Sequence, residues 1–306
     1  MSIALIIPDR KLDALQAKLQ QVLPEVPIEI WPAIAEPNAV KMAVLWRHPA
    51  GSLTPMTGLL ALQSFGAGVD NILADPTLPP LPLARIVDHD LTQAMLQYLQ
   101  GVVGYYRLRI DQYQRQQQQQ QWKPRSPRAL QTLCVLGLGQ LGAATAVFFQ
   151  QQGFAVSGWS ATAKTLPGID CYHGPEQFNT AVASADMVIC LLPLTPATTG
   201  LLDQAAFAAF KTGAIFINVA RGAIVDDVAL LQQLDSGQLS AACLDVFSTE
   251  PLPSSHPFWQ HPAVLITPHV SAVTNVETVV AQIAENYQRA VTGQPLLNPV
   301  QRERGY

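Results

Sequence analysis

The sequence predicts an α/β protein with two domains, each built on a parallel sheet. Short apolar runs typical of buried strands alternate with helical periodicity along the chain, which favours parallel strands joined by crossover helices. The chain has 306 residues, of which 49% are hydrophobic, so it can fill two separate cores. Ligands of such sheets bind beyond the carboxyl ends of the strands, so we expect an active-site cleft between the two domains.

A glycine-rich motif marks the second domain. Gly137, Gly139 and Gly142 fill the positions of G-x-G-x-x-G between an apolar strand and an Ala-rich helix at 143–152. The first glycine of this motif permits a tight turn, the second lets the backbone approach a pyrophosphate, and the third lets helix and strand pack closely. The N-terminus of the helix that follows offers free N–H groups, which suit phosphates. An ordinary turn is the alternative, but the strand–turn–helix context favours a Rossmann-like dinucleotide site.

The two domains are expected to be Rossmann-like or flavodoxin-like. Residues 1–95 plus 288–306 form a substrate-binding domain, and residues 96–287 form the dinucleotide-binding domain.

Periodicity over 91–121 predicts one long helix that crosses between domains or packs in a dimer. A glutamine run at 116–121 ends this stretch. Trp122 follows it and is either a core anchor or a contact with a partner subunit. Other helices are expected at 11–22, 226–234 and 275–291, and strands at 2–7, 28–31, 42–46, 59–65, 86–87, 154–159, 185–192, 214–219, 241–246 and 264–267.

Composition excludes several function classes. Charged residues make up only 13% of the chain and the net charge is -4, so neither nucleic acid nor a membrane surface is an expected partner. No apolar run is long enough to span a bilayer, and a cytoplasmic location is expected. The four cysteines lie far apart, three of them in strand-like runs, which predicts buried thiols. No Cys/His spacing typical of a metal site appears, so no metal is expected.

The loop at 160–164 bears on the choice of cofactor. A carboxylate expected about 20 residues beyond the glycines would bond the ribose 2′-hydroxyl of NAD. No Asp or Glu stands there; Ser160, Thr162 and Lys164 offer hydroxyl groups and a positive charge instead. This favours NADPH over NADH. Ala161 and Ala163 occupy the positions where an arginine would hold the 2′-phosphate, so the preference is expected to be modest, and use of both cofactors is the alternative.

Four polar residues are candidates for chemistry because each lies beyond a predicted strand. Arg221 is the best cation for a carboxylate, and His269 is the best acid or base. Glu250 and Asp245 are equal candidates, by spacing, for the carboxylate that orients the histidine. A further candidate is the turn at 66–70, which is either a plain turn or a nest of backbone N–H groups for an anion.

These motifs together resemble the D-isomer-specific 2-hydroxyacid dehydrogenase family over essentially the whole length. Features at 65–70, 159–160, 252–253, 259–262 and 304–306 are similar to its glyoxylate/hydroxypyruvate reductase A branch. The motifs that carry the family resemblance are G-L-G-Q-L-G at 137–142, L-P-L-T-P-A-T at 192–198, N-V-A-R-G at 218–222, L-D-V-F at 244–247 with Glu250-Pro251, and Pro268-His269.

The resemblance implies an NADPH-dependent reductase that converts glyoxylate to glycolate and hydroxypyruvate to D-glycerate. It assigns catalysis to Arg221, Glu250 and His269, with Asp245 near the nicotinamide. Substrate contacts are implied for Trp46, Ala67, Gly68 and Arg221, and a homodimer is implied through the cofactor domain. The expected cofactor contacts are Gly137, Gly139, Gln140, Leu141, Gly142, Ser160, Thr162, Lys164, Leu192, Pro193, Thr198, Val219, Ala220, Arg221, Asp245, His269 and Ala272.

Two rival functions remain at this stage. The nearer one is reduction of another 2-oxo acid, such as pyruvate or phenylpyruvate, or use of NADH, because the shape of the pocket decides both. The other is a non-catalytic nucleotide-sensing protein that keeps the fold to recruit partners. Presence of all three candidate catalytic residues favours an enzyme, and turnover on any 2-oxo acid separates the two classes.

Overall fold

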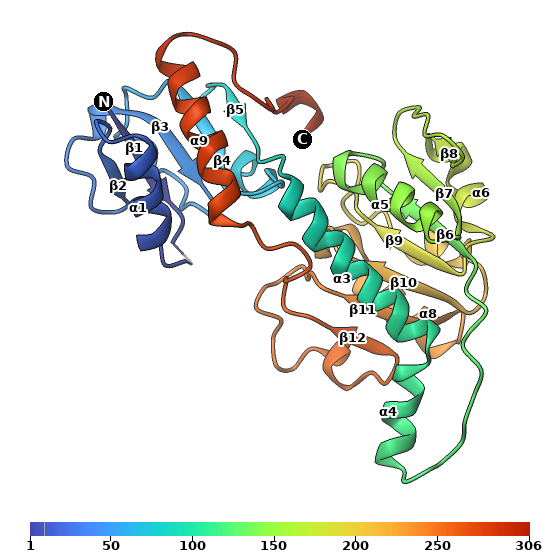
Figure 1. Cartoon of the computed structure of the whole chain (residues 1–306). Coiled ribbons are helices and arrows are strands. Elements are labelled where there is room, and N and C mark those ends of the chain that lie inside the picture. The colour runs from blue at the N-terminus through green and yellow to red at the C-terminus, as the bar shows by residue number, and fades with distance from the viewer. Residues whose placement is uncertain (9) are drawn as a thin grey trace. The chain divides into compact units, whose positions relative to one another are not determined.

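The computed structural model describes residues 1–8 and 10–306 and divides them into two compact units. Unit 1 comprises Met1–Leu91 and Thr274–Tyr306, and unit 2 comprises Thr92–Val273. Each unit has its own parallel sheet (Figure 1), so the predicted class of two α/β domains with parallel sheets is confirmed. Among the described residues, no helix is long and apolar enough to cross a membrane.

The sheet of unit 1 has five parallel strands in the order β2-β1-β3-β4-β5. Its central strands are buried except at Lys41 and are rich in branched apolar residues, as expected for a sheet covered on both faces. Its strands are β1 (Ser2–Ile6), β2 (Ile28–Ile30), β3 (Val40–Leu45), β4 (Ala61–Ser64) and β5 (Leu83–Ala84).

Helices α1 (Asp13–Val22) and α9 (Val276–Val291) pack side by side on one face of this sheet (Figure 1). Asn275 caps α9 by accepting from the N–H of Glu277. The apolar stripe of α9 runs from Val279 to Tyr287 and is buried in the unit 1 core. The boundary expected at 287/288 therefore falls inside a helix that unit 1 holds entirely. Short α2 (Asp70–Leu73) and the 3₁₀ turns η1 (Pro37–Ala39) and η5 (Arg302–Arg304) complete the unit.

The sheet of unit 2 has seven parallel strands in the order β12-β11-β10-β9-β6-β7-β8. Its cysteines fit the prediction of buried thiols at three positions, Cys134, Cys190 and Cys243, while Cys171 is half-buried. The strands are β6 (Thr132–Leu136), β7 (Ala155–Ser160), β8 (Asp170–His173), β9 (Met187–Cys190), β10 (Ala214–Asn218), β11 (Leu239–Leu244) and β12 (Val264–Ile266).

Helices cover both faces of this sheet. Helices α3 (His89–Arg107), which begins in unit 1, and α5 (Gln140–Gln151) bury apolar residues on one face. The other face is covered by α6 (Phe178–Val182), α7 (Gln204–Ala208) and α8 (Asp227–Asp235). The remaining turns are η2 (Pro175–Gln177), η3 (Gly222–Ile224) and η4 (Pro257–Gln260).

The expected long helix over 91–121 is wrong: it is two helices, α3 and α4 (Ile110–Gln118). The break lies at Arg109, whose φ of 62° is left-handed and cannot continue a helix. The expected strand at 86–87 is also misplaced, since β5 lies at Leu83–Ala84. Strand β8 was not predicted at all.

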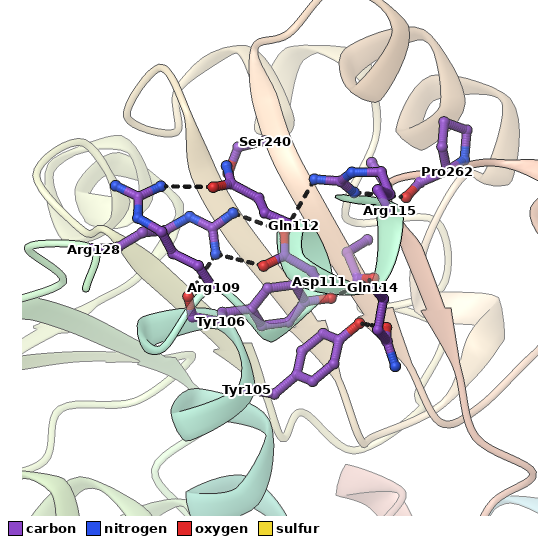
Figure 2. Close-up of polar contacts among 12 residues, drawn as sticks. Tyr105, Tyr106, Arg109, Asp111, Gln112, Gln114, Arg115, Arg128, Ser240 and Pro262 are labelled. Atoms are coloured by element: carbon purple, nitrogen blue, oxygen red, sulfur yellow. Dashed lines mark hydrogen bonds and ion pairs between the residues drawn. The ribbon is translucent and has the colours of Figure 1, made fainter. Parts of the chain in front are cut away.

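A buried carboxylate fixes the start of α4 (Figure 2). Asp111 accepts two parallel bonds from Arg128, at 2.8 and 2.7 Å, and a third from Arg115 at 3.3 Å. Arg115 and Arg128 also donate to the carbonyls of Pro262 and Tyr106. Burial alone would raise the pKa of Asp111, but the bonds and charges of the two arginines outweigh it and lower that pKa. This cluster therefore ties α4 to the body of unit 2.

Replacing Asp111 with Asn should destabilise unit 2, because the amide leaves two guanidinium groups without their negative partner. We expect a loss of about 2 kcal/mol in the free energy of unfolding at neutral pH, measured by urea denaturation. Because the pKa is lowered in the folded state, this contribution is complete above about pH 4. It disappears as the pH falls through the folded-state pKa.

Asp235→Asn is the control. Asp235 pairs with His261, but its side chain is 75% exposed, so the loss in the free energy of unfolding should stay below about 0.5 kcal/mol. Equal losses of unfolding free energy in the two variants would contradict the stabilising role of the Asp111 cluster.

Candidate active site

The candidate catalytic residues follow three neighbouring strands of the unit 2 sheet. Strands β10, β11 and β12 end in register at Asn218, Leu244 and Ile266. Arg221, Asp245 and His269 come directly after these three ends. The carboxyl ends of parallel strands meet at one edge of the sheet, where α/β proteins bind their ligands. The fold therefore brings these side chains to a common edge.

The imidazole ring of His269 contacts Glu250 and not Asp245. His269 Nδ1 lies 2.8 Å from Glu250 Oε2, while Glu250 Oε1 accepts from the N–H of Phe247 at 3.0 Å. An ionised carboxylate only accepts, so Nδ1 carries the hydrogen of this bond. Proton exchange with a substrate is left to Nε2. The His269 side chain is 31% exposed, which keeps the ring accessible from solvent.

Asp245 instead holds the main chain around His269. This carboxylate is completely buried and accepts from Thr267 Oγ1 at 2.6 Å and from the N–H groups of Val270 and Ser271, both at 2.9 Å. The carbonyl of Asp245 accepts from the N–H of His269 at 2.8 Å. His269 has a φ of 56°, a left-handed conformation that costs energy for a residue with a side chain. The bonds to Asp245 offset that cost.

Arg221 lies in a turn that its neighbours define. The side chain of Asn218 accepts from the N–H of Ala220 at 3.0 Å and donates to the carbonyl of Arg221 at 3.1 Å. The half-buried guanidinium donates to the carbonyl of Ala220 at 2.6 Å. A Cβ at Gly222 would collide with the main chain of Phe247 and Ser248. The Arg221 turn is thus packed against the segment that leads to Glu250.

The glycine-rich turn fits a dinucleotide. Gly137 has a φ of 101°, and a Cβ there or at Gly142 would collide with neighbouring main chain. A Cβ at Gly139 would meet no atom of the described residues within 4 Å, so open space lies beside it. No side chain among those residues caps the first turn of α5 behind Gly139, which leaves the N–H groups of Gln140 and Leu141 without a capping side chain. A pyrophosphate needs this combination of a tight turn and an open, uncapped helix end.

The 160–164 loop presents a mixed surface. Ser160 is buried at the end of β7, and its hydroxyl donates to the carbonyl of Thr162 at 2.8 Å. Thr162 and Lys164 are exposed, as are Ala161 and Ala163. The loop is therefore free to meet a ligand through a lysine and hydroxyl oxygens.

The remaining expected cofactor contacts lie in loops along the same edge. The hydroxyl of Thr198 donates to the carbonyl of Pro193 at 2.6 Å and so closes the turn after β9. Three of the apolar residues, Leu192, Val219 and Ala220, are buried, whereas Ala272 is half-buried.

The expected substrate contacts Trp46, Ala67 and Gly68 belong to unit 1. The Ser64 hydroxyl accepts from the N–H of Gly66 at 3.2 Å and donates to the carbonyl of Gly68 at 2.9 Å, which closes the turn. A Cβ at Gly66 would strike the Trp46 ring, so the two pack together. Within residues 1–8 and 10–306, no acceptor meets the N–H groups of Ala67 and Gly68. These N–H groups could therefore meet an anion.

The sequence did not predict the hydrogen bonds from Tyr98 and Thr267 that hold Asp245 beside the His269 turn. Tyr98, on α3, bonds Thr267 at 2.6 Å, and Thr267 in turn bonds Asp245. Burial is the main cause that raises the pKa of Tyr98, and burial also raises the pKa of the adjacent Cys243 thiol to about 12. Both groups are therefore neutral donors at physiological pH. The position of Thr267, two residues before His269, was the one signal in the sequence.

Comparison with known proteins decides the family. The family model for the D-isomer specific 2-hydroxyacid dehydrogenase, NAD binding domain, matches residues 103–271. This chain belongs to the D-isomer-specific 2-hydroxyacid dehydrogenases. It is 40% identical over 286 residues to the glyoxylate/hydroxypyruvate reductase A of Serratia proteamaculans, covering 91% of each chain. It is 38% identical over 296 residues to the protein of that name from Yersinia enterocolitica, covering 94% of each chain. The predicted family and branch are confirmed, and the chain is an NAD(P)-dependent oxidoreductase.

Solved structures of the family agree over the whole chain. A D-isomer specific 2-hydroxyacid dehydrogenase from Xanthobacter autotrophicus Py2, in complex with NADPH and MES, is 36% identical with a TM-score of 0.95, covering 100% of this chain and 99% of that one. The NADPH-dependent glyoxylate/hydroxypyruvate reductase from Sinorhizobium meliloti, in complex with NADP and sulfate, is 30% identical with a TM-score of 0.93, and both chains are covered completely. Relatives with this fold therefore bind nicotinamide cofactors.

Replacing Asp245 with Asn should release the turn that carries His269. An amide can accept at only one end, so its NH₂ group faces a donor among Thr267, Val270 and Ser271. We expect hydrogen exchange at the N–H groups of Val270 and Ser271 to become at least about tenfold faster, which is the loss of one bond to a charged group. The turnover number should fall with it, because His269 loses its position.

The matched control is Asp186→Asn. Asp186 also accepts two main-chain N–H groups, those of Gln131 and Thr132, at 2.7 and 3.0 Å. Exchange should then accelerate at residues 131 and 132 alone, with turnover retained. Unchanged exchange at Val270 and Ser271 in the Asp245 variant would refute its role in holding the turn.

Proposed function

We propose that this chain reduces glyoxylate to glycolate and hydroxypyruvate to D-glycerate, with NADPH as the preferred reductant. The observation that carries the proposal is the His269–Glu250 pair, with Nδ1 bound and Nε2 left for proton transfer, on the sheet edge that also presents Arg221. The names of the Serratia and Yersinia relatives support this choice of substrates.

Arg221 holds the carboxylate of the 2-oxo acid. A guanidinium stays charged and can bind both carboxylate oxygens through parallel bonds, which fixes the orientation of the neighbouring ketone. Ala67 and Gly68 contribute main-chain N–H groups to the same carboxylate, and Trp46 shields it from water. The N–H groups of Ala67 and Gly68, which meet no acceptor within residues 1–8 and 10–306, support this assignment.

His269 donates the proton. NADPH supplies a hydride for C2 of the substrate, and the ketone oxygen gains negative charge as that carbon is reduced. Protonated Nε2 of His269 gives its proton to this oxygen, which stabilises charge where it develops in the transition state. Glu250 stabilises the imidazolium beforehand and keeps the ring aimed. His269 then recovers a proton from solvent, which its partial exposure permits.

Residues along the unit 2 edge would hold the cofactor. Main-chain groups of 137–142 take the pyrophosphate, and Ser160, Thr162 and Lys164 take the 2′-phosphate. Asp245 and Ala272 lie at the nicotinamide end, while the turns after β9 and β10 line the middle. The open space beside Gly139 and the acid-free 160–164 loop support this assignment, as do the NADPH and NADP named with two solved relatives.

The protein acts as a homodimer through unit 2. The connection from α3 through α4 to Trp122 leaves apolar side chains in water: Trp122 is 96% exposed and Leu108 is 55% exposed. Burying such residues against a second copy is favourable. Sedimentation should therefore give twice the chain mass of 33.1 kDa; a monomer at micromolar concentration would contradict this.

The first test is oxidation of NADPH and of NADH by the purified protein with glyoxylate, hydroxypyruvate and pyruvate. We expect the highest kcat/KM for NADPH with the first two acids. A preference for NADH would contradict the role of the 160–164 loop but leave the Arg–Glu–His chemistry standing. Cofactor binding without turnover on any 2-oxo acid would favour a nucleotide-sensing protein instead.

Two variants connect the activity to its residues. Arg221→Lys keeps the charge but loses the planar pair of donors, and His269→Asn removes the acid while tolerating the left-handed conformation. Each should lower kcat/KM by at least about a hundredfold and leave NADPH binding, followed by its fluorescence, within a few-fold of the unaltered protein. Turnover retained in either variant would remove that residue from the mechanism.

A further inference from the structure

Strand β8 brings a histidine beside the 160–164 loop. β8 forms the edge of the unit 2 sheet and pairs in parallel with β7, so that Ser160 and His173 are register partners and both end their strands. Neighbouring strands of a sheet lie about 5 Å apart. His173 is therefore adjacent to the first residue of the loop that we assign to the 2′-phosphate.

The two side chains lie on the same face of the sheet. One residue earlier on each strand, Trp159 and Tyr172 both pack into the core on the side of α6. Successive side chains of a strand point to opposite faces, so Ser160 and His173 point to the side of α5. Cys171, two residues before His173, does pack into the core on that side. The glycine-rich turn leads into α5, so His173 lies on the cofactor side.

The 160–165 loop alone provides few positive charges for a phosphate. Lys164 is the one positive side chain in the 160–165 loop, which has no acidic residue. The nearest carboxylates in sequence are Asp170, which begins β8 and pairs with Ser157, and Glu176, whose carboxylate lies beside the main chain of Gly174. His173 is exposed, and its own N–H donates to Gln177 Oε1 at 2.8 Å, which fixes the main chain and leaves the imidazole in solvent.

We propose that His173 is a specificity-determining residue that binds the 2′-phosphate of NADPH, in place of the basic side chains that Ala161 and Ala163 do not provide. An imidazole N–H donates to a phosphate oxygen in either charge state and adds a positive charge when protonated. The inference rests on the proposed use of NADPH. If so, the discrimination between NADPH and NADH depends on strand β8, which holds none of the cofactor contacts expected from the sequence.

The experiment is a charge series at one exposed position in the full chain: His173→Ala, His173→Arg and His173→Glu. The dissociation constants of NADPH and NADH are measured by cofactor fluorescence, which needs no turnover. We expect His173→Ala to weaken NADPH binding roughly tenfold and to leave NADH within twofold. His173→Arg should restore or strengthen NADPH binding, and His173→Glu should weaken it further than Ala. The control His261→Ala, which removes a histidine paired with Asp235, should leave the ratio unchanged.

The outcomes separate this inference from the proposed function. If the unaltered protein prefers NADPH and the ratio is the same in all three His173 variants, the inference is overturned and the proposed function stands. If the variants weaken NADPH and NADH equally, His173 only stabilises β8, and the inference is again overturned. If the unaltered protein prefers NADH but the series still changes NADPH affinity alone, the inference holds while the proposed cofactor preference fails.

Discussion

The geometry of the candidate active site depends on one buried carboxylate. Asp245 has no exposed surface, and a buried charge is tolerated only when hydrogen bonds replace its lost water. Three donors from residues 267–271 do so. Those donors converge on one side chain only if the chain turns sharply at His269, which accounts for the left-handed φ there. The hydrogen bonds that replace the lost water around Asp245 are thus the same ones that hold His269 in its left-handed conformation.

Glu250 and Asp245 divide between them two tasks that a single carboxylate could not perform. Asp245 is fixed in the sheet, directly after β11, and binds main-chain groups. Glu250 lies on the following loop, where one of its oxygens accepts from the N–H of Phe247 and the other contacts the ring of His269. Close packing of Gly222 against residues 247–248 keeps that loop beside the Arg221 turn. Main-chain bonds and close packing therefore help to set this arrangement, together with the contact between Glu250 and His269.

Much of this could be predicted from the sequence, because strand ends and glycine patterns are local. The alternation of apolar runs predicted the two parallel sheets, and G-x-G-x-x-G predicted the turn before α5. The choice between Glu250 and Asp245 was open because it depends on how residues 248–249 fold back, which no periodicity encodes. Strand β8 was missed because it is a short edge strand with exposed ends and two half-buried residues. The break at Arg109 was missed because a left-handed residue leaves helical periodicity on both sides intact.

Polar groups lie at the carboxyl edge of the sheet in each unit, but they are of different kinds. In unit 1, β3 and β4 lead to Trp46 and to the 66–68 turn, where main-chain N–H groups supply partial positive charge without an ionised side chain. The guanidinium of Arg10 lies 5.8 Å from the centre of the Trp46 ring and 5.6 Å from that of Phe65, so cation–π contact holds a full charge beside the same edge. In unit 2 the ionisable side chains of Arg221, Glu250 and His269 lie on turns that follow the strands. Positive charge thus lies at the carboxyl edge of each sheet, as main-chain dipoles in unit 1 and as the guanidinium of Arg221 in unit 2.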